Sequence, residues 1–215
     1  MDNASARLRC LTGLAAVWAG AFPMCSIADL DESKLVERLQ QGGNILVVQH
    51  LVTGRPARTD AVADCRDKSA FRDQGWRDAI SLGTGLHRQA IRIERAVTSP
   101  DCRARYTAYL AFGVDKAQLD PQLGDLCRAP ADSKPARLQA LNMHLSTPPP
   151  HPGVNVALVT HACNLRAYAQ PDWPDCATKT RPGDALVFAP RKDHPPELLG
   201  CLSLPTLKKW SLMPW

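Results

Sequence analysis

The sequence lacks several features that define common classes of protein. No cluster of Lys and Arg of the kind that follows a nucleic-acid backbone is present, and the formal net charge is only +5 in 215 residues. It has no CxxC pair and no Cys/His set at the spacing of a zinc site, which argues against a metal centre. It also lacks internal repeats and any linker long enough to separate two domains. We therefore expect a single domain with no nucleic-acid partner and no metal.

Long apolar runs are also missing, with one exception near the start of the chain. Two arginines precede the apolar stretch Cys10 to Phe22, and a small-x-small site ends at Ala28. This combination predicts a secretory signal peptide over residues 1–28 and a mature domain over residues 29–215. The run is too short to cross a bilayer comfortably, so we expect no stable membrane anchor after the signal is removed. A retained anchor is the alternative.

The cysteine count is even once this segment is set aside. Six cysteines remain, namely Cys65, Cys102, Cys127, Cys163, Cys176 and Cys201. An even number in an exported chain predicts disulfides and an oxidising compartment, so we expect a periplasmic or secreted protein. Six cysteines allow fifteen pairings, and the residues alone do not choose among them.

Helix and strand patterns alternate along the mature domain. Helices are predicted at Asp31–Leu39, Gly75–Ile91, Asp101–Phe112 and Ala136–Leu145, and strands at Asn44–Gln49, Ala96–Thr98, Val154–Thr160, Ala185–Ala189 and Glu197–Leu202. In the second helix an apolar face is expected from Trp76, Ala79, Ile80, Leu82 and Leu86. The alternation predicts an α/β fold of three layers, in which helices flank a mostly parallel central sheet.

Three of these predicted strands end in residues suited to an anion. His50 follows the first strand, Arg103 lies in the first turn of the helix after the second, and His161 follows the third. Parallel sheets bind ligands beyond the carboxyl ends of their strands, and helix N-termini favour anions. Each residue alone is more often structural or a surface charge. Their combination predicts that the three side chains converge on one site.

The same motifs resemble those of the histidine phosphatase (phosphoglycerate mutase-like) superfamily. Gly43 to His50 is similar to its opening strand and Arg-His motif, and Thr98 to Ala108 to its Ser-Pro-x-x-Arg-Ala-x-x-Thr-Ala stretch. Val156 to His161 resembles its second histidine motif, and Pro182 to Phe188 its late Gly-Glu-Ala strand. Asp64-Cys65, followed by Gly75 to Ala79, looks like the helix-opening segment of exported bacterial members. The matches occur in order and cover most of residues 43–190.

The resemblance implies a phosphoric monoester hydrolase that needs no cofactor. His50 would attack phosphorus and carry the phosphoryl group, with its other ring nitrogen held by a backbone carbonyl. Arg103 would bind the phosphoryl oxygens, and His161 would stabilise the charge that develops on them. Asp125 stands where the family usually has Glu and would protonate the leaving group. The substrate implied is a small or sugar phosphate, with the oligomeric state left open.

Gln49 departs from the family pattern, which has Arg before the nucleophilic His. An amide can donate a hydrogen bond but carries no charge, and the loss of a charged hydrogen bond of about 1.5–3 kcal/mol corresponds to a roughly 10- to 100-fold effect. Arg55, Arg58 or Arg166 could supply the missing charge. Thr53 matches a Ser or Thr that often follows the His in the family. Leu51 stands where the family has a small residue and could crowd the pocket floor.

These features leave several functions open. The first is a phosphomonoesterase weakened by Gln49, and the second is a catalytically degenerate relative that binds a phosphorylated ligand or glycan without turnover. A mutase is a weaker third reading, because export separates the chain from glycolytic substrates and little sequence is available for a lid.

The resemblance also suggests disulfide partners. Cys65 and Cys102 would both lie at the edge of the active site, where a bridge would anchor a loop and orient Arg103. Cys176 with Cys201 is a second candidate pair, which leaves Cys127 and Cys163.

Overall fold

The computed structural model describes residues 30–51, 65 and 73–214. The predicted signal peptide and the candidate residues Thr53, Arg55 and Arg58 lie outside these residues. The helices are α1 (Glu32–Gln41), α2 (Asp73–Arg88), α3 (Cys102–Phe112), α4 (Lys134–Ser146), α5 (Ala162–Tyr168), α6 (Asp175–Thr178) and α7 (Leu204–Ser211), with short 3-10 turns η2 (Pro121–Leu123) and η3 (Ala131–Ser133). The strands are β1 (Ile45–Gln49), β2 (Ile93–Thr98), β3 (Ala117–Leu119), β4 (Asn155–Thr160), β5 (Ala185–Ala189) and β6 (Glu197–Leu202).

The strands form one six-stranded sheet in the order β3-β2-β4-β1-β5-β6. Strands β1 to β4 are mutually parallel, whereas β5 runs antiparallel to both β1 and β6. The mostly parallel sheet predicted from the alternation is therefore confirmed. Because β2, β4 and β1 are adjacent and parallel, the residues that follow them emerge at one edge of the sheet.

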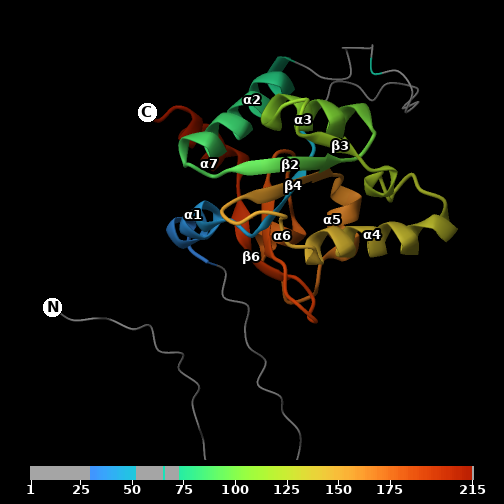
Figure 1. Cartoon of the computed structure of the whole chain (residues 1–215). Coiled ribbons are helices and arrows are strands. Elements are labelled where there is room, and N and C mark those ends of the chain that lie inside the picture. Colours follow the sequence, from blue (N-terminus) through green and yellow to red (C-terminus); the bar gives the residue numbers. More distant parts are fainter. Residues whose placement is uncertain (1–29, 52–64, 66–72, 215) are drawn as a thin grey trace, which may run out of the picture.

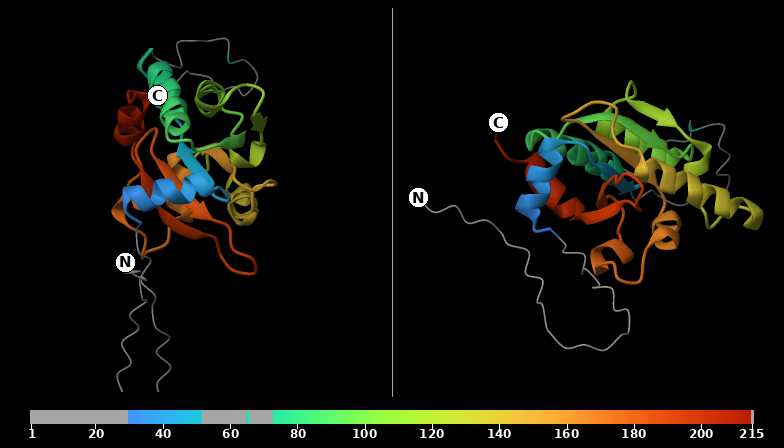
Figure 2. Two further views of the ribbon diagram at one scale, coloured as in Figure 1. Left: turned by 60° about the vertical axis from the view of Figure 1, so that its left-hand side comes forward. Right: turned by 60° about the horizontal axis from the view of Figure 1, so that its bottom comes forward.

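Helices cover both faces of this sheet and make three layers (Figure 1). On one face α2, α3 and α7 pack with α1 against side chains such as Leu46 and Val48 of β1. On the other face α4, α5 and α6 pack against Ile45 and Val47, the alternate side chains of the same strand. All five residues of β1 are buried, which explains why its sequence is a continuous apolar run rather than an alternating one. The views in Figure 2 show the same layers from two further sides.

The apolar face predicted for α2 is wrong at one residue. Ile80 was expected in the core but is 51% exposed, while the buried side of the helix includes Gly75, Ala79, Leu82 and Gly85. A Cβ on Gly85 would lie 2.2 Å from the backbone oxygen of Leu207 in α7, so only glycine allows this approach. The face is therefore marked by glycines as well as by large apolar residues.

The remaining departures are one strand boundary and four elements that the sequence patterns did not indicate. The strands at β5 and β6 have the predicted bounds, whereas β2 begins at Ile93 rather than Ala96. Strand β3 and helices α5, α6 and α7 had not been predicted. Within residues 30–214, no helix that the structure describes is both long and apolar enough to span a bilayer.

Candidate active site

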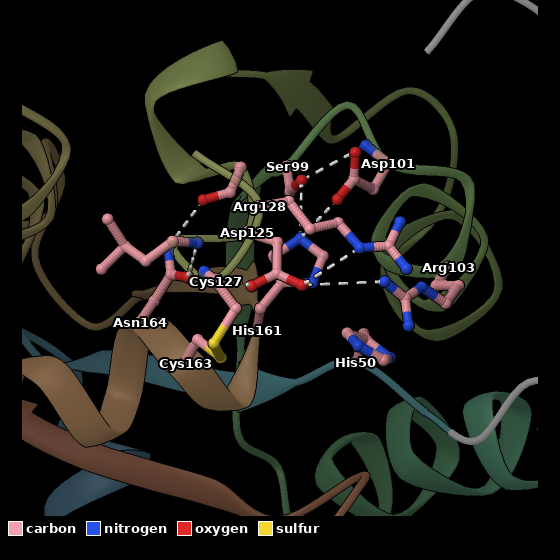
Figure 3. A network of polar contacts seen from close by, with 12 residues as sticks. His50, Ser99, Asp101, Arg103, Asp125, Cys127, Arg128, His161, Cys163 and Asn164 are labelled. Atoms are coloured by element: carbon pink, nitrogen blue, oxygen red, sulfur yellow. Dashed lines mark hydrogen bonds and ion pairs between the residues drawn. A yellow bond between two sulfur atoms is a disulfide. The ribbon is translucent and has the colours of Figure 1, made fainter. Parts of the chain in front are cut away.

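The carboxyl ends of β1, β2 and β4 bring the predicted residues together. His50 directly follows β1 and His161 directly follows β4, and their ring centroids lie 5.0 Å apart with an interplanar angle of 65°. Arg103 extends from the first turn of α3 into the same region (Figure 3). Its side chain is only 18% exposed. The expected convergence of two imidazoles and one guanidinium is thus present.

His50 is held in the orientation that a nucleophile requires. Its Nδ1 lies 2.9 Å from the backbone oxygen of Leu51, and because a carbonyl only accepts, Nδ1 carries the proton and Nε2 presents a lone pair. Burial, followed by the nearby charges of His161 and Arg103, lowers the pKa of His50 to about 4, despite the opposing hydrogen bond to Leu51. The ring is therefore neutral at physiological pH.

His161 is held through its Nε2 nitrogen. Its Nε2 lies 2.9 Å from Ser99 Oγ and 3.0 Å from Asp101 Oδ2, and its side chain is 2% exposed. Its Nδ1 is buried and has no hydrogen-bond partner. Hydrogen bonding to His161 keeps the pKa of Asp101 below its usual value, against the effect of burial. Asp101 and Ser99 are site residues that the sequence prediction missed.

Asp125 lies between two guanidinium groups. Its Oδ2 is 3.9 Å from Arg103 Nη2 and 3.9 Å from Arg128 Nε, and its side chain is 14% exposed. Figure 3 shows both arginine side chains directed toward this carboxylate. Asp125 therefore joins the predicted cluster, and Arg128 adds a second cation that the sequence prediction did not include.

The segment that carries Asp125 is fixed to β4 and α5 by side chains. Asn164 accepts a hydrogen bond from the backbone N–H of Leu126 and donates to the carbonyls of Leu123 and Gly124. Thr160 Oγ also donates to the carbonyl of Leu123. These bonds fix the segment of Asp125 to β4 and α5, the two elements that flank His161. The same elements therefore position both Asp125 and His161.

Three disulfides join the six cysteines of the described residues, namely Cys65–Cys102, Cys127–Cys163 and Cys176–Cys201. The pairing suggested for Cys65 with Cys102, next to Arg103, and for Cys176 with Cys201 is confirmed. Among the described residues, the one group of potential metal ligands is Asp125 with Cys127 and Cys163. Because those two sulfurs are bonded to each other, they offer no thiolate to a metal ion.

Gln49 is 6% exposed, and its Oε1 has no hydrogen-bond partner. It pairs in register with Thr160, whose hydroxyl reaches Leu123, so Gln49 faces the side of the sheet that carries the Asp125 segment. Leu51 does not crowd the pocket as expected, because its side chain is buried in a small cluster with Ala79.

The proposed charge replacement by Arg166 is not what the described contacts show. Arg166 is exposed and its Nη2 lies 3.4 Å from Cys163 Sγ, beside the disulfide. Arg128 instead supplies a guanidinium next to Asp125. Its position three residues after Asp125 is the sequence feature that could have indicated it, since the turn there returns the chain toward the carboxylate.

Similar folds are found among solved structures. Neither a protein-family profile nor a curated protein sequence matches the chain. The protein histidine phosphatase SixA in complex with tungstate aligns with a TM-score of 0.52 at 16% identity, over 77% of this chain and 99% of its own. A protein assigned as the phosphohistidine phosphatase SixA of Agrobacterium tumefaciens aligns with a TM-score of 0.52 at 14% identity, over 75% and 98%.

A phosphoserine phosphatase from Entamoeba histolytica, solved with 3-phosphoglyceric acid, gives a TM-score of 0.50 at 12% identity, over 76% of this chain and 98% of its own. Identities this low establish a shared fold rather than a shared activity. The chain thus has the phosphoglycerate mutase-like fold, and its structural neighbours are members of the histidine phosphatase superfamily.

Proposed function

We propose that the protein is a phosphomonoesterase that acts on a small or sugar phosphate through a phosphohistidine at His50. The observation that carries the proposal is the pairing of a neutral His50, with Nε2 free, and a second imidazole 5.0 Å away beside Arg103. The structural neighbours that hold tungstate and 3-phosphoglyceric acid support a phosphorylated ligand of this size.

In the first step Nε2 of His50 attacks phosphorus and the bond from phosphorus to the ester oxygen breaks. Arg103 holds the phosphoryl oxygens, and the Nδ1 side of His161 faces the charge that develops on them. The bound phosphate dianion competes for Arg103 and Arg128 and favours a protonated Asp125, which gives its proton to the departing alkoxide, so that an alcohol leaves. The product is an N-phosphorylated His50 and an Asp125 carboxylate.

In the second step the Asp125 carboxylate takes a proton from water while the water oxygen attacks phosphorus. The bond from phosphorus to Nε2 breaks, inorganic phosphate leaves, and both His50 and protonated Asp125 are restored. The hydrogen bond from Nδ1 to Leu51 keeps the nucleophilic nitrogen free of a proton for the next cycle.

Arg128 supports activity in spite of Gln49. A phosphoryl group bound at His50 competes with Asp125 for the guanidinium groups of Arg103 and Arg128, which both lie 3.9 Å from Oδ2. We infer that Arg128 contributes part of the positive charge that an arginine at position 49 would provide. On this account Gln49 slows the reaction without abolishing it.

Gln49 also favours a second candidate function. The amide is buried and its Oε1 is unsatisfied, so a site without the missing charge could retain a phosphorylated ligand without transferring its phosphate. A protein of this kind would bind phosphate analogues but release no phosphate.

The three disulfides support a location in an oxidising compartment, the periplasm or the exterior. We propose that residues 1–28 act as a signal peptide and that the mature chain begins close to residue 29.

Hydrolysis of p-nitrophenyl phosphate by the mature chain, measured from acidic to neutral pH beside His50→Ala, tests the enzyme proposal. We expect turnover that disappears in His50→Ala. Binding of tungstate without turnover above the His50→Ala background would favour the binding protein instead.

A further inference from the structure

We propose that Asp101 is a positioning residue that fixes the proton of His161 on Nε2 and thereby turns Nδ1 toward the phosphoryl group. The inference rests on the proposed function, because it assigns a role within the same site. The Ser-Pro-x-x-Arg motif leaves this position variable, so the motif itself does not account for an acidic residue there.

The contacts of His161 locate its ring proton on Nε2. A carboxylate can only accept, and Asp101 Oδ2 lies 3.0 Å from His161 Nε2, so this contact requires an Nε2–H donor. Ser99 Oγ lies 2.9 Å from the same nitrogen and accepts a hydrogen bond from the backbone N–H of Asp101, so the serine ties the two residues together. A neutral His161 with Nε2 unprotonated would face the carboxylate with a lone pair, which is unfavourable.

The other ring nitrogen of His161 has no protein partner. With Nε2 held by Asp101 and Ser99, Nδ1 is buried without a partner and can donate to a ligand only when the ring carries a second proton. The buried carboxylate of Asp101 stabilises that second proton electrostatically, and it is the anion in direct contact with the ring. Asp101 therefore sets both the direction and the charge of the donor.

Asp101 does not cap α3 with its side chain. Asp101 is the residue at the N-cap of this helix, where an aspartate ordinarily accepts from a backbone N–H of the first turn. Its side chain makes no such capping bond and contacts His161 instead. The carboxylate is thus committed to the imidazole rather than to the helix, so its replacement removes no cap bond from α3.

Three other titratable or charged groups lie around His161. His50, directly after β1, is neutral, Arg103 on α3 is cationic, and Asp125 in the segment after η2 is shared between Arg103 and Arg128. Both guanidinium groups oppose a positive charge on the ring. Asp101 is the anion in contact with the ring itself.

The test compares Asp101→Asn and Asp101→Ala with Asp175→Asn as a matched control. Asparagine keeps the size and the N-cap preference of aspartate but removes its charge. Asp175 is an exposed acid on α6 that pairs with Lys179 and has no contact with the site. The readouts are the pH profile of kcat/KM for p-nitrophenyl phosphate and the ¹⁵N spectrum of histidine-labelled protein, with His161 assigned through His161→Gln.

We expect Asp101→Asn to lower kcat/KM about 10- to 100-fold near neutral pH, as for the loss of one charged hydrogen bond. The loss should be larger at high pH than at low pH, because the positive ring has lost its counter-charge. Asp175→Asn should match the wild-type profile. An even loss at every pH would indicate a merely structural role and would overturn the proposal.

The spectrum tests the inference even if the protein shows no turnover. We expect a wild-type His161 protonated on Nε2, and an Asp101→Ala protein in which that proton is no longer fixed. A neutral wild-type ring protonated on Nδ1, or spectra of His161 that are identical in the two proteins, would contradict the role of Asp101. Absence of turnover with the expected spectra would instead reject the phosphatase proposal alone.

Discussion

His50 and His161 lie with their ring centroids 5.0 Å apart, although they follow two different strands of the sheet. Each ring is held through one of its nitrogens, His50 by the carbonyl of Leu51 and His161 by Ser99 and Asp101. The site is therefore ordered in advance of any ligand, with one nitrogen of each ring left for it.

The first prediction concerns the protonation of His50. Because burial, His161 and Arg103 disfavour its charged form, an NMR titration of the His50 ring should give a midpoint near pH 4 rather than 6.5. The exposed His194, replaced by Gln in a control variant, should leave this midpoint unchanged. A midpoint at the ordinary value of 6.5 would mean that His50 is not in the environment described.

The same shift has a consequence for stability. As the pH falls below 6.5, the unfolded chain binds a proton at this histidine before the folded chain does, so the free energy of unfolding decreases toward pH 4. Well above pH 6.5 the ring is neutral in both the folded and the unfolded chain, so His50 causes no loss of stability there. Chemical denaturation of His50→Gln across this range should show a weaker pH dependence than wild type.

The second prediction concerns the charge that binds phosphate. Arg128→Ala should lower kcat/KM about 10- to 100-fold, whereas Gln49→Arg should raise it by a similar factor, because each changes one charged hydrogen bond to the phosphoryl group. Arg191→Ala is the control, since Arg191 pairs with Glu197 at an exposed site. Wild-type kinetics in Arg128→Ala would remove Arg128 from the account.

The third prediction concerns the proton donor. Asp125→Asn should reduce hydrolysis of alkyl phosphates by roughly 10²- to 10⁴-fold, in the range of general acid catalysis. Hydrolysis of p-nitrophenyl phosphate should suffer much less in its first step, because nitrophenolate leaves without a proton. Equal losses for both substrates in single-turnover experiments would assign Asp125 a binding role instead.

The fourth prediction concerns the disulfide beside the acid. Replacing Cys127 and Cys163 with Ser should cost about 2–4 kcal/mol of stability, as expected for loss of a disulfide, and should also lower turnover of alkyl phosphates. Removing Cys176–Cys201 in the same way provides the control, because that bridge joins α6 to β6 and has no contact with Asp125. Equal turnover in the two double variants would show that Cys127–Cys163 does not position the acid.

Much of this architecture is predictable because it follows from local patterns. Buried parallel strands are continuous apolar runs, so β1 and β4 are evident in the sequence. The residues that directly follow such strands are then the candidates for the site. His50, Arg103 and His161 belong to such strand ends. Adjacent parallel strands then bring these residues together without any further information.

The parts that were missed depend on contacts between distant segments. An aspartate before a helix is ordinarily a capping residue, so nothing local indicates that Asp101 turns to His161 instead. Arg128 reaches the site only because Asn164 and a disulfide fold its segment back onto α5. Ile80 was misplaced because glycines, which carry no hydrophobic signal, determine where α2 meets its neighbours.

The most direct test of the account is to locate the transferred phosphoryl group. The protein would be mixed with p-nitrophenyl phosphate, quenched in base where phosphohistidine survives, digested and mapped by mass spectrometry, beside His50→Ala. The account predicts a phosphorylated peptide modified at His50 and no such peptide from His50→Ala. Phosphate release by the wild-type protein with no modified His50, or modification at another residue, would contradict it.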